Sequence, residues 1–343
     1  MEENNHSSFV SIIVPCRNEE KFISKCLDSI MVNDYPQEKL EVLVVDGMSE
    51  DKTREIIRRY GGKHSFLKLI ENPKKITPAA MNIGIQNSKG EIIIKMDAHT
   101  VYDKDYISKC VKHLKESGAD NVGGVLITLP AKDTLVAKAI AISLSHLFGA
   151  GSSYFRIGSK KPREVDTVAF GCYKKEVFKK IGLFDEKMAQ IEDFELNSRL
   201  RKAGGKIMLF PDIKAFYYPS SDNLKDFFKH NFTDGIWSTF PLKFGFRVSL
   251  RHLIPLIFVL SLIGLAAFSF ISKIFLILFL YMILLYLLAA LLFSLKIAKK
   301  EREIRFLFIL PIVFATRHIG YGLGSILGLI KIGNFLKKYP FFF

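Results

Sequence analysis

The sequence predicts an α/β domain with a mostly parallel sheet, followed by C-terminal transmembrane helices. Over the first 220 residues, short apolar runs alternate with segments of helical periodicity. Two uncharged apolar runs of 20 and 22 residues follow, and the last 91 residues hold ten Lys or Arg but only two Asp or Glu. Wholly apolar strands that alternate with helices indicate a parallel sheet covered on both faces.

The first predicted domain, residues 1–221, divides into strands and helices. Strands are expected at 10–15, 41–46, 66–70 and 91–97, and helices at 18–31, 49–59 and 77–90. Thr77 is expected to cap the last of these helices, with Pro78 in its first turn. Ligands bind such sheets beyond the carboxyl ends of the strands, so the residues that follow each strand are candidates for a site.

A C-terminal membrane domain is predicted over residues 253–343. The runs 253–272 and 274–295 carry no charge, and each is long enough to cross a ~30 Å hydrocarbon layer as a helix. Only Lys273 separates them. They are therefore predicted to form a helical hairpin.

A third apolar run, 306–330, contains Arg317 and His318. An arginine facing lipid costs about 3 kcal/mol on insertion scales. The run is therefore a packed third span, a re-entrant segment or an interfacial helix. The glycines of the sequence GYGLG, 320–324, favour a close helix contact, and a lipid-phosphate contact by Arg317 is the alternative.

Residues 222–252 are predicted to be an interfacial amphipathic segment, because aromatic and basic side chains alternate there directly before the first span. The connection 296–305 carries five Lys or Arg. By the excess of basic residues, this connection and the N-terminal domain should face the cytosol. The expected location is the plasma membrane, with membrane lipids as partners.

Composition and charge exclude several classes of protein. Hydrophobic residues make up 49% and charged residues 24% of the chain, which excludes intrinsic disorder, collagen and coiled coil. The four cysteines contain no CxxC pair, which argues against a zinc ribbon or a disulfide framework. The first nine residues are polar and acidic, so no secretory signal peptide is expected. Although the net charge is +15, no arginine-rich arm indicates a nucleic-acid partner.

The first strand ends in a polar turn that includes Pro15, Arg17, Asn18 and Glu19. This turn lacks GxGxxG, which argues against a dinucleotide fold. Its polar side chains are nevertheless well placed to meet a ligand.

The second strand ends at Asp46, followed by Ser49 and Asp51. A carboxylate here can accept hydrogen bonds from a base or a ribose. The alternative is that Asp46 only helps a turn and Asp51 only caps a helix.

The fourth strand ends in Asp97, Ala98 and His99. The period of a strand would place Asp97 and His99 on the same face. A carboxylate and an imidazole side by side can share a divalent cation, Mg²⁺ or Mn²⁺, that offsets diphosphate charge. The alternative is a hydrogen-bonded aspartate beside a surface histidine.

A further pair of acids, Glu192 and Asp193, opens a helix expected to run to Arg201. The helix macrodipole would keep such a carboxylate ionised and lower its basicity. An ordinary first turn rich in acids is the alternative.

Taken in order, these blocks resemble family 2 glycosyltransferases of the GT-A nucleotide-sugar fold. The matching blocks are PCRNEE (15–20), VVDGMSEDKT (44–53), a helix with Asn82 and Gly84, KMDAHT (95–100), FGCYKKEVFKKIGLFDE (170–186) and IEDFELNSRLRKAGG (191–205). The resemblance covers about residues 8–240 and is closest to membrane-anchored bacterial polysaccharide glycosyltransferases of the succinoglycan-biosynthesis type.

The resemblance implies a role for each residue at the strand ends. It implies a nucleoside pocket lined by Pro15, Arg17, Asn18 and Glu19; a base-binding Asp46 with Ser49 and Asp51 beside it; donor contact by Asp97; a divalent cation held by Asp97 and His99; an acceptor side shaped by Phe170, Gly171, Glu192 and Trp237; and Asp193 as catalytic base.

The activity implied is transfer of one sugar from a nucleotide-diphosphate donor, usually a UDP-sugar, to a lipid-linked saccharide with inversion. Two departures from the family pattern matter: His99 replaces the second Asp of D-x-D, and the Q-x-x-R-W motif of processive synthases is missing. The second departure favours single addition, since only Gly235, Ile236 and Trp237 stand near that place. Two alternatives are transfer to a bare polyprenyl phosphate and a non-catalytic membrane subunit that retains the fold.

Overall fold

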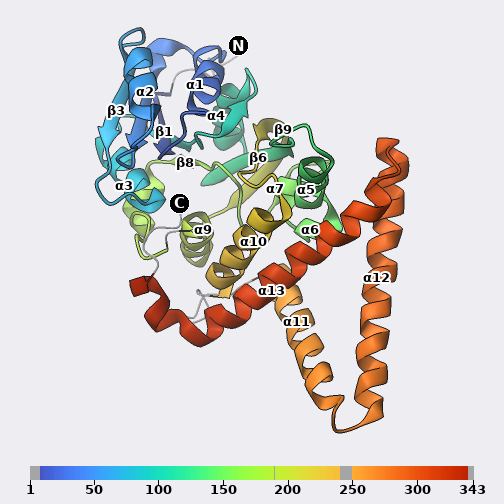
Figure 1. Ribbon diagram of the computed structural model, residues 1–343. Coiled ribbons are helices and arrows are strands. Elements are labelled where there is room, and N and C mark those ends of the chain that lie inside the picture. The colour runs from blue at the N-terminus through green and yellow to red at the C-terminus, as the bar shows by residue number, and fades with distance from the viewer. Residues whose placement is uncertain (1–7, 189, 240–248, 339–343) are drawn as a thin grey trace. The chain divides into compact units, whose positions relative to one another are not determined.

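The structure is a computed structural model that describes residues 8–188, 190–239 and 249–338, with the side chains of 331–338 left out. It divides into two units, coloured by residue number in Figure 1. The first unit comprises 8–127 and 158–217, and the second comprises 128–157 and 218–338, each over its described residues. The second unit thus includes residues 128–157, from the middle of the chain. The predicted first domain, residues 1–221, contains this segment.

The first unit is built on a sheet that contains nine strands within the described residues. The strands are β1 (Val10–Cys16), β2 (Leu40–Asp46), β3 (Leu67–Glu71), β4 (Ile92–Lys95), β5 (Thr100–Tyr102), β6 (Asn121–Thr128), β7 (Arg163–Glu164), β8 (Cys172–Lys174) and β9 (Ile207–Tyr217). Their order is β3-β2-β1-β4-β8-β6-β9-β5, with β7 paired to β9. Strands β3, β2, β1 and β4 are parallel, whereas β8 is antiparallel to β4 and β6, and β9 to β5 and β7.

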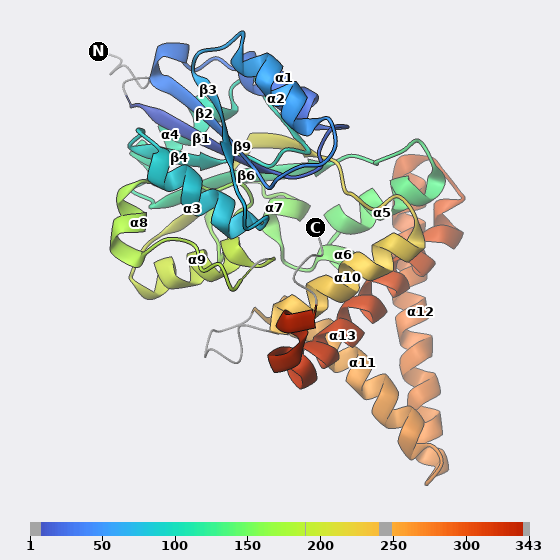
Figure 2. The ribbon, with the colours of Figure 1, turned by 60° about the vertical axis from the view of Figure 1, so that its left-hand side comes forward.

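Helices cover both faces of the parallel strands. Those of the first unit are α1 (Ile23–Met31), α2 (Thr53–Gly61), α3 (Thr77–Asn87), α4 (Tyr106–Glu116), α8 (Glu176–Ile181) and α9 (Glu192–Lys202). Helices α1 and α2 lie on one face and α3 on the other (Figure 2), as right-handed crossovers require when the strand order reverses at β1. The α/β prediction is confirmed, and the four cysteines are all free and buried.

Three predicted boundaries are wrong. Helix α1 begins at Ile23 instead of residue 18. Asn18 has a left-handed backbone conformation, with φ 54°, which is incompatible with a right-handed α-helix. Strand β4 ends at Lys95, and residues 97–99 form a turn into β5. Thr77 is the first residue of α3 and does not cap it, since Ile76 precedes the helix and no side chain bonds its end.

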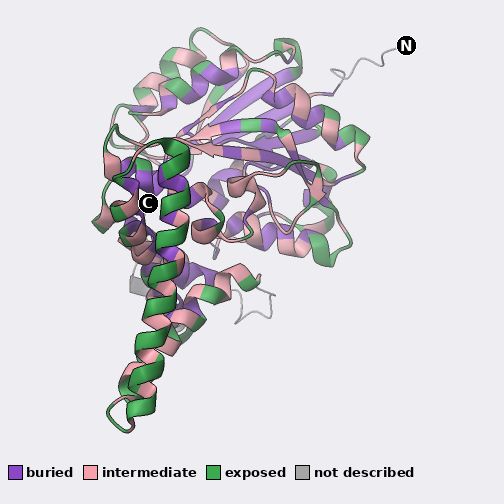
Figure 3. Cartoon of the chain, turned by 90° about the vertical axis from the view of Figure 1, so that its right-hand side faces the viewer, coloured by how far each residue is buried: buried purple, intermediate pink, exposed green. Residues whose placement is uncertain are grey.

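The second unit is helical. It contains α5 (Leu135–Ser145), α6 (Leu147–Ala150), α7 (Tyr154–Ile157), α10 (Leu224–Thr239), α11 (Leu250–Phe268), α12 (Lys273–Glu301) and α13 (Phe306–Lys338). Three of its helices are long and apolar enough to cross a membrane: α11, α12, and α13 as far as Ile330. Helices α11 and α12 form a hairpin that exposes apolar side chains along its length (Figure 3). The chain is a membrane protein by this criterion.

Helix α13 runs obliquely to the hairpin and along α10 (Figures 1 and 2). Its glycines permit backbone contact: a Cβ on Gly324 would lie 1.9 Å from the carbonyl oxygen of Phe232 in α10. A Cβ on Gly322 would lie 2.4 Å from the carbonyl oxygen of Pro255 in α11. The close helix contact predicted for the glycines is therefore confirmed. Of the predicted interfacial segment, α10 is described, and residues 240–248 lie outside the described residues.

Candidate active site

Polar residues meet at one edge of the sheet in the first unit. Because β1, β2, β3 and β4 are parallel, their carboxyl ends Cys16, Asp46, Glu71 and Lys95 lie along the same edge. The candidate nucleotide and metal residues follow these ends in the chain, whereas Asp193 lies in the first turn of α9 and bonds Lys95 at the end of β4. The parallel topology therefore places the residues that follow the strand ends along one edge.

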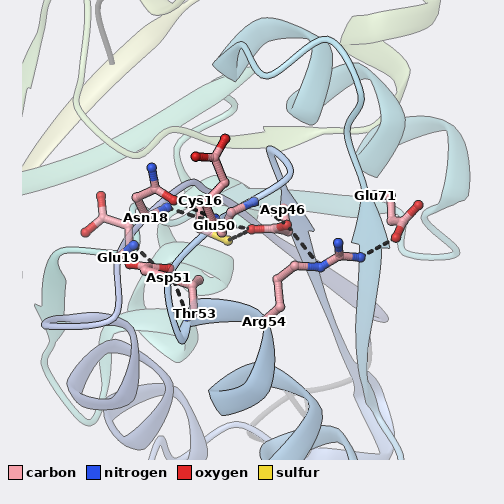
Figure 4. A network of polar contacts seen from close by, with 10 residues as sticks. Cys16, Asn18, Glu19, Asp46, Glu50, Asp51, Thr53, Arg54 and Glu71 are labelled. Carbon is pink, nitrogen blue, oxygen red and sulfur yellow. Dashed lines mark hydrogen bonds and ion pairs between the residues drawn. The ribbon is translucent and has the colours of Figure 1, made fainter.

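The loop after β1 (residues 17–20, the first loop) and the loop after β2 (residues 47–52, the second loop) are bonded to each other (Figure 4). The backbone N–H of Asn18 donates to Ser49 Oγ at 2.8 Å, and the N–H of Glu50 donates to Asn18 Oδ1 at 2.9 Å. Asn18 can do both because it is in the left-handed region, which asparagine tolerates better than most residues. Such strained backbone persists where the surrounding structure fixes it, and it is common at binding sites.

Asp51 completes this connection. Its Oδ2 accepts the N–H of Glu20 at 3.1 Å, and its Oδ1 accepts the N–H of Thr53 at 2.9 Å. The hydroxyl of Thr53 in turn accepts the N–H of Glu19 at 2.7 Å. Burial raises the pKa of the Asp51 carboxyl, but the bonds from Thr53 and Glu20 outweigh it and lower the pKa below its usual value. Asp51 thus supports the two loops as an ionised acceptor.

Asp46 is fully buried and surrounded by donors (Figure 4). Ser49 donates to it twice, with its backbone N–H at 3.0 Å and with its hydroxyl. Arg54 Nε lies 3.5 Å from Asp46 Oδ2 and offsets the buried charge, and the same guanidinium pairs with Glu71. Burial, followed by the charge of Asp46, raises the pKa of the Cys16 thiol well above its usual value, so Cys16 is neutral.

Arg17 lies across the second loop. Its Nη2 is 3.9 Å from Glu50 Oε1, and a Cβ on Gly47 would come within 3.2 Å of the Arg17 Cβ. Pro15 is inside β1, opposite Val45 of β2. The predicted nucleoside-pocket residues therefore occupy one strand end and the loop that follows it.

The second part of the site is a buried ion-pair cluster. Lys95, at the end of β4, has a side chain that is 3% exposed. Its Nζ donates to Asp193 Oδ2 at 2.6 Å and to Glu192 Oε1 at 2.9 Å. The other carboxylate oxygen of the aspartate, Asp193 Oδ1, is buried and has no hydrogen-bond partner among the described residues. One oxygen is thus held in place and the other is left for a ligand.

Burial changes the acid–base properties of this cluster. Burial raises the pKa of the Asp193 carboxyl, with Lys95 opposing the shift, and it raises the pKa of Glu192 to about 7. Burial lowers the pKa of Lys95, but Asp193 and Glu192 outweigh it and raise the pKa well above its usual value, so the ammonium stays charged. The expected lowering of Asp193 basicity by the helix macrodipole is therefore wrong, because desolvation of the carboxylate dominates.

We expect Glu192→Gln to remove a pH dependence of stability. The pKa of Glu192 in the folded chain, about 7, lies above its ordinary value of 4.5, so the folded state binds the proton more tightly. This contribution to stability is complete below pH 4.5 and is lost as the pH rises through 7. Between pH 5 and 8 the midpoint of thermal unfolding should thus fall more steeply for the unmodified protein than for Glu192→Gln. If the thermal midpoints of the two proteins fell equally with pH, the expected role of Glu192 would be contradicted. Glu38→Gln, at an exposed position, is the control.

Asp97 and His99 lie in the turn between β4 and β5. His99 Nδ1 is 3.1 Å from Glu19 Oε1, so the site pairs the histidine with a first-loop carboxylate. A proton on Nδ1 would leave Nε2 free to bind a metal, an arrangement common for metal-bound histidines. Burial lowers the pKa of His99, but the bond to Glu19 outweighs it and raises the pKa above 6.5.

The carboxylate of Asp97 has no hydrogen bond or ion pair to the described residues. Its backbone N–H donates to the hydroxyl of Tyr102 at 2.6 Å. Its charge acts on the titration of both His99 and Asp193, so the three side chains share one electrostatic environment. No group of three or more metal-binding side chains occurs in the described part of the chain. A cation here would take two protein ligands and complete its shell from a donor or water.

The predicted acceptor residues divide between the two units. Phe170, with φ 53°, is 4% exposed and packs edge-on against Tyr102 at a ring distance of 5.7 Å. The carbonyl of Gly171 accepts the N–H of Lys95 at 3.1 Å. Trp237 belongs to α10 of the second unit and is 7% exposed.

Two positioning residues escaped prediction from the sequence. Arg199 Nη2 donates to the carbonyl of Leu183 at 2.8 Å, and its Nε donates to Glu195 Oε1 at 2.6 Å, which ties α9 to the end of α8. The Glu–Arg spacing of four residues was a readable signal for this pair. Lys95 had none, since its partners are 97 and 98 residues away in the chain. Asn82, quoted as a motif residue, exchanges both bonds with the backbone of Phe184, at 2.9 and 3.0 Å.

Comparison with known proteins defines the class. The family described as Glycosyl transferase family 2 matches residues 11–182, and the chain belongs to this family. It is a glycosyltransferase with three long apolar helices at its C-terminal end.

Particular relatives extend the likeness along the chain. It is 30% identical over 335 residues to the dolichyl N-acetyl-alpha-D-glucosaminyl phosphate 3-beta-D-2,3-diacetamido-2,3-dideoxy-beta-D-glucuronosyltransferase of Methanococcus voltae, covering 95% of this chain and 98% of that protein. It is 29% identical over 247 residues to succinoglycan biosynthesis protein ExoA of Rhizobium meliloti, covering 67% and 74%. The solved mannosyltransferase PcManGT from Pyrobaculum calidifontis, in complex with GDP-Man and Mn²⁺, has the same fold, with a TM-score of 0.64 and 20% identity over 94% of this chain and 87% of that one.

Proposed function

We propose that this glycosyltransferase transfers a sugar, with inversion, from a nucleotide-diphosphate donor to a lipid-linked saccharide. The observation that carries the proposal is the state of Asp193. One of its carboxylate oxygens is fixed by Lys95, and the other is buried without a partner in the described residues. A carboxylate so placed, with a raised pKa, is suited to accept a proton from a hydroxyl.

The donor nucleotide binds along the first and second loops. Asp46 lies at the end of β2 with its charge balanced by Arg54, and its oxygens face the donors of Ser49. Because Asp46 is fully buried and bonded to Ser49, an N–H group of a base such as uracil would take the place of a Ser49 donor. A UDP-sugar is the proposed donor, and the bonded loops provide a preformed surface for it.

Asp97 and His99 fit a divalent cation. The carboxylate of Asp97 is unengaged among the described residues, and Nε2 of His99 can be free while Nδ1 binds Glu19. An oxygen and a nitrogen ligand suit Mn²⁺ or Mg²⁺. When bound, the cation would supply positive charge against the diphosphate. The presence of Mn²⁺ in the complex of the mannosyltransferase from Pyrobaculum calidifontis supports this choice.

The reaction needs one displacement. Asp193 Oδ1 takes the proton of an acceptor hydroxyl while that oxygen forms a bond to the anomeric carbon. The bond from this carbon to the diphosphate oxygen breaks, and its electron pair leaves with the nucleotide. Attack from the face opposite the leaving group inverts the anomeric configuration and requires no protein nucleophile. Lys95 holds Asp193 in position throughout.

The acceptor is proposed to be a prenyl-phosphate-linked sugar at the cytosolic face of the cell membrane. The name of the relative from Methanococcus voltae describes transfer to a dolichyl N-acetylglucosaminyl phosphate, and that relative matches nearly the whole chain. The basic connection between α12 and α13, residues 296–305, supports the cytosolic orientation. Surface-glycan assembly is the proposed process.

The test is a donor panel on the purified full-length protein in detergent. We expect nucleotide release from one of UDP-, GDP- or dTDP-sugars in the presence of prenyl-phosphate-linked N-acetylglucosamine. Removing divalent cations with EDTA should abolish release, and Mn²⁺ or Mg²⁺ should restore it. No release with any donor would refute the proposed activity, and release that EDTA leaves unchanged would refute the cation.

A further inference from the structure

Helix α13 is surrounded differently from the two helices of the hairpin. Of its candidate membrane span, 33% is buried within the structure, against 11% for α11 and 6% for α12. The glycines on one side of α13 bring its backbone against α10. Length and composition make α13 a candidate span, so its neighbours decide whether it crosses the membrane.

Helices α10 and α13 run parallel and in register. A Cβ on Gly320 would lie 3.1 Å from the carbonyl oxygen of Phe228, and a Cβ on Gly328 would lie 2.5 Å from the carbonyl oxygen of Ile236. The contact of Gly324 with α10 falls midway between these two. Each advance of four residues along α13 therefore matches an advance of four residues along α10.

This shared direction is incompatible with a crossing by both helices. The hairpin of α11 and α12 separates α10 from α13 in the chain. Successive membrane spans run in opposite directions, so α10 and α13 would be antiparallel if all four helices crossed one after another. Because they are parallel, at most one of the two crosses the membrane.

The outer side of α10 keeps that helix out of the hydrocarbon layer. Its exposed side chains include Lys225, Asp226, Lys229 and His230. A charged side chain at the centre of a bilayer costs about 3 kcal/mol on insertion scales. Helix α10 therefore lies in water or among headgroups. Residues 320–328 of α13 pack directly on it, so they lie within one interhelical distance, about 8–10 Å, of that level.

The contact of α13 with α11 agrees with this shallow position. A Cβ on Gly322 would lie 2.4 Å from Val259 Cγ2, in the third turn of α11. At 1.5 Å per residue, Gly322 is about 24 Å along α13 from its first residue, whereas Val259 is about 14 Å along α11. The hairpin returns the chain to the surface at which α11 begins, so two spans starting there would be equally deep where they touch. Helix α13 instead runs obliquely past the start of α11 (Figure 1).

The exposed side chains of α13 are apolar and lie mostly on one face. Over residues 306–330 they are between 38% and 70% exposed and comprise Phe308, Ile312, Ile319, Leu329 and Ile330. With 3.6 residues per turn, all but Leu329 fall within about 40° of one another around the helix axis, and the glycines that contact α10 lie on the far side. We refer to Phe308, Ile312, Ile319 and Ile330 as the apolar stripe. The pair of helices is thus charged on one side and apolar on the other, as helices that lie on a membrane are.

We propose that α13 lies in the membrane interface and does not cross, with the apolar stripe against the acyl chains and α10 on its aqueous side. The stripe is covered by the same bilayer that holds the hairpin, since α13 contacts α11 at Gly322 and continues the apolar surface of the hairpin. The described part of the chain then crosses the membrane twice, and α13 ends on the side where α12 ends. This placement does not depend on the proposed reaction.

Labelling from one side of the membrane tests the placement in the full-length protein, reconstituted into sealed vesicles with one predominant orientation. Single cysteines are introduced near the end of α13, at the end of α12 and in the turn of the hairpin, by Asn334→Cys, Glu301→Cys and Ile271→Cys. With a membrane-impermeant maleimide, Asn334→Cys and Glu301→Cys should be labelled to the same fraction before permeabilisation, and Ile271→Cys to the complementary fraction. The unmodified protein gives the background, since its four cysteines are buried.

A second measurement tests what covers the apolar stripe. A nitroxide is attached to the stripe in Ile319→Cys and, as the matched control, to an exposed position of α10 in Lys229→Cys. The ratio of collisions with oxygen, which concentrates in acyl chains, to collisions with a water-soluble nickel chelate should be higher for Ile319→Cys. Ile326→Cys, on the same face of α13, takes its place if Ile319→Cys lowers the midpoint of thermal unfolding.

Three results would overturn the placement. If Asn334→Cys were labelled to the same fraction as Ile271→Cys, α13 would cross the membrane. If the nitroxide on the stripe met the nickel chelate as often as the nitroxide in Lys229→Cys does, the stripe would face water. If it collided with neither oxygen nor the chelate, a protein surface such as a second copy of the chain would cover the stripe in place of lipid.

Discussion

Asp193→Asn is expected to lower the turnover of sugar transfer by about 10²- to 10⁴-fold, the usual contribution of a general base. The amide cannot take the proton from the attacking hydroxyl, yet it retains an oxygen that can accept the bond from Lys95. Binding of the free nucleotide diphosphate should persist, because the ion pair of Asp193 is with Lys95 and no hydrogen bond or ion pair joins it to the described residues of the first and second loops. Turnover is measured as nucleotide release at saturating donor and acceptor, and nucleotide binding by calorimetry.

The control for this substitution is Asp212→Asn. Asp212 lies in β9 of the same unit. Its side chain is 48% exposed and pairs with His113 of α4. It should leave turnover unchanged. Transfer to a bare polyprenyl phosphate makes a different prediction, because that acceptor is already an anion. Suppose that Asp193→Asn retained most of the turnover while Asp97→Ala abolished it. The proposals that the acceptor is a hydroxyl and that Asp193 is its base would then both be wrong.

The parallel half of the sheet could be predicted from the sequence because each strand is a short, wholly apolar run followed by polar residues. That pattern placed Asp46 at the end of β2, where it lies, and ended the fourth strand at Asp97, two residues beyond the end of β4 at Lys95. Parallel pairing then brings the ends to one edge without further information. The antiparallel half was not predicted, since β5, β7 and β8 are two or three residues long and carry no readable period.

The charge balance of the site could not be predicted, for a different physical reason. Arg54 and Lys95 offset buried acids, but each looks like an ordinary surface residue in a sequence. Only the fold reveals which acids are buried. Burying their charge is costly, so each needs a basic partner. The same holds for the bond of His99 to Glu19, which joins residues 80 positions apart.

The apolar run 306–330 shows a similar limit. Hydropathy and length allow a span, and α13 is indeed long and apolar enough for one. Its glycines, however, are explained by backbone contact with α10 and α11, which depends on where those helices lie. The composition of a helix indicates whether it can lie in a membrane. Which helices it contacts depends on how the chain packs.

Lys95→Met is expected to destabilise the first unit by about 3–5 kcal/mol, the usual cost of breaking a buried ion pair from one side. It leaves the buried Glu192 and the partly buried Asp193 as neighbouring carboxylates without their cation. Both will then hold protons more tightly, so transfer activity at pH 7 should fall with Asp193 protonated. The measurements are thermal unfolding of the full-length protein and nucleotide release between pH 6 and 9.

A double substitution separates the loss of the cation from simple damage to packing. In Lys95→Met with Glu192→Gln, one of the two uncompensated carboxylates is gone, so part of the lost stability should return and the two effects should not add. Lys95→Arg keeps the charge and should retain more of both stability and activity than Lys95→Met. If the effects of Lys95→Met and Glu192→Gln were additive, the bonds of 2.6 and 2.9 Å would not couple these residues energetically. Asp193 would then owe its position to the packing of α9 alone.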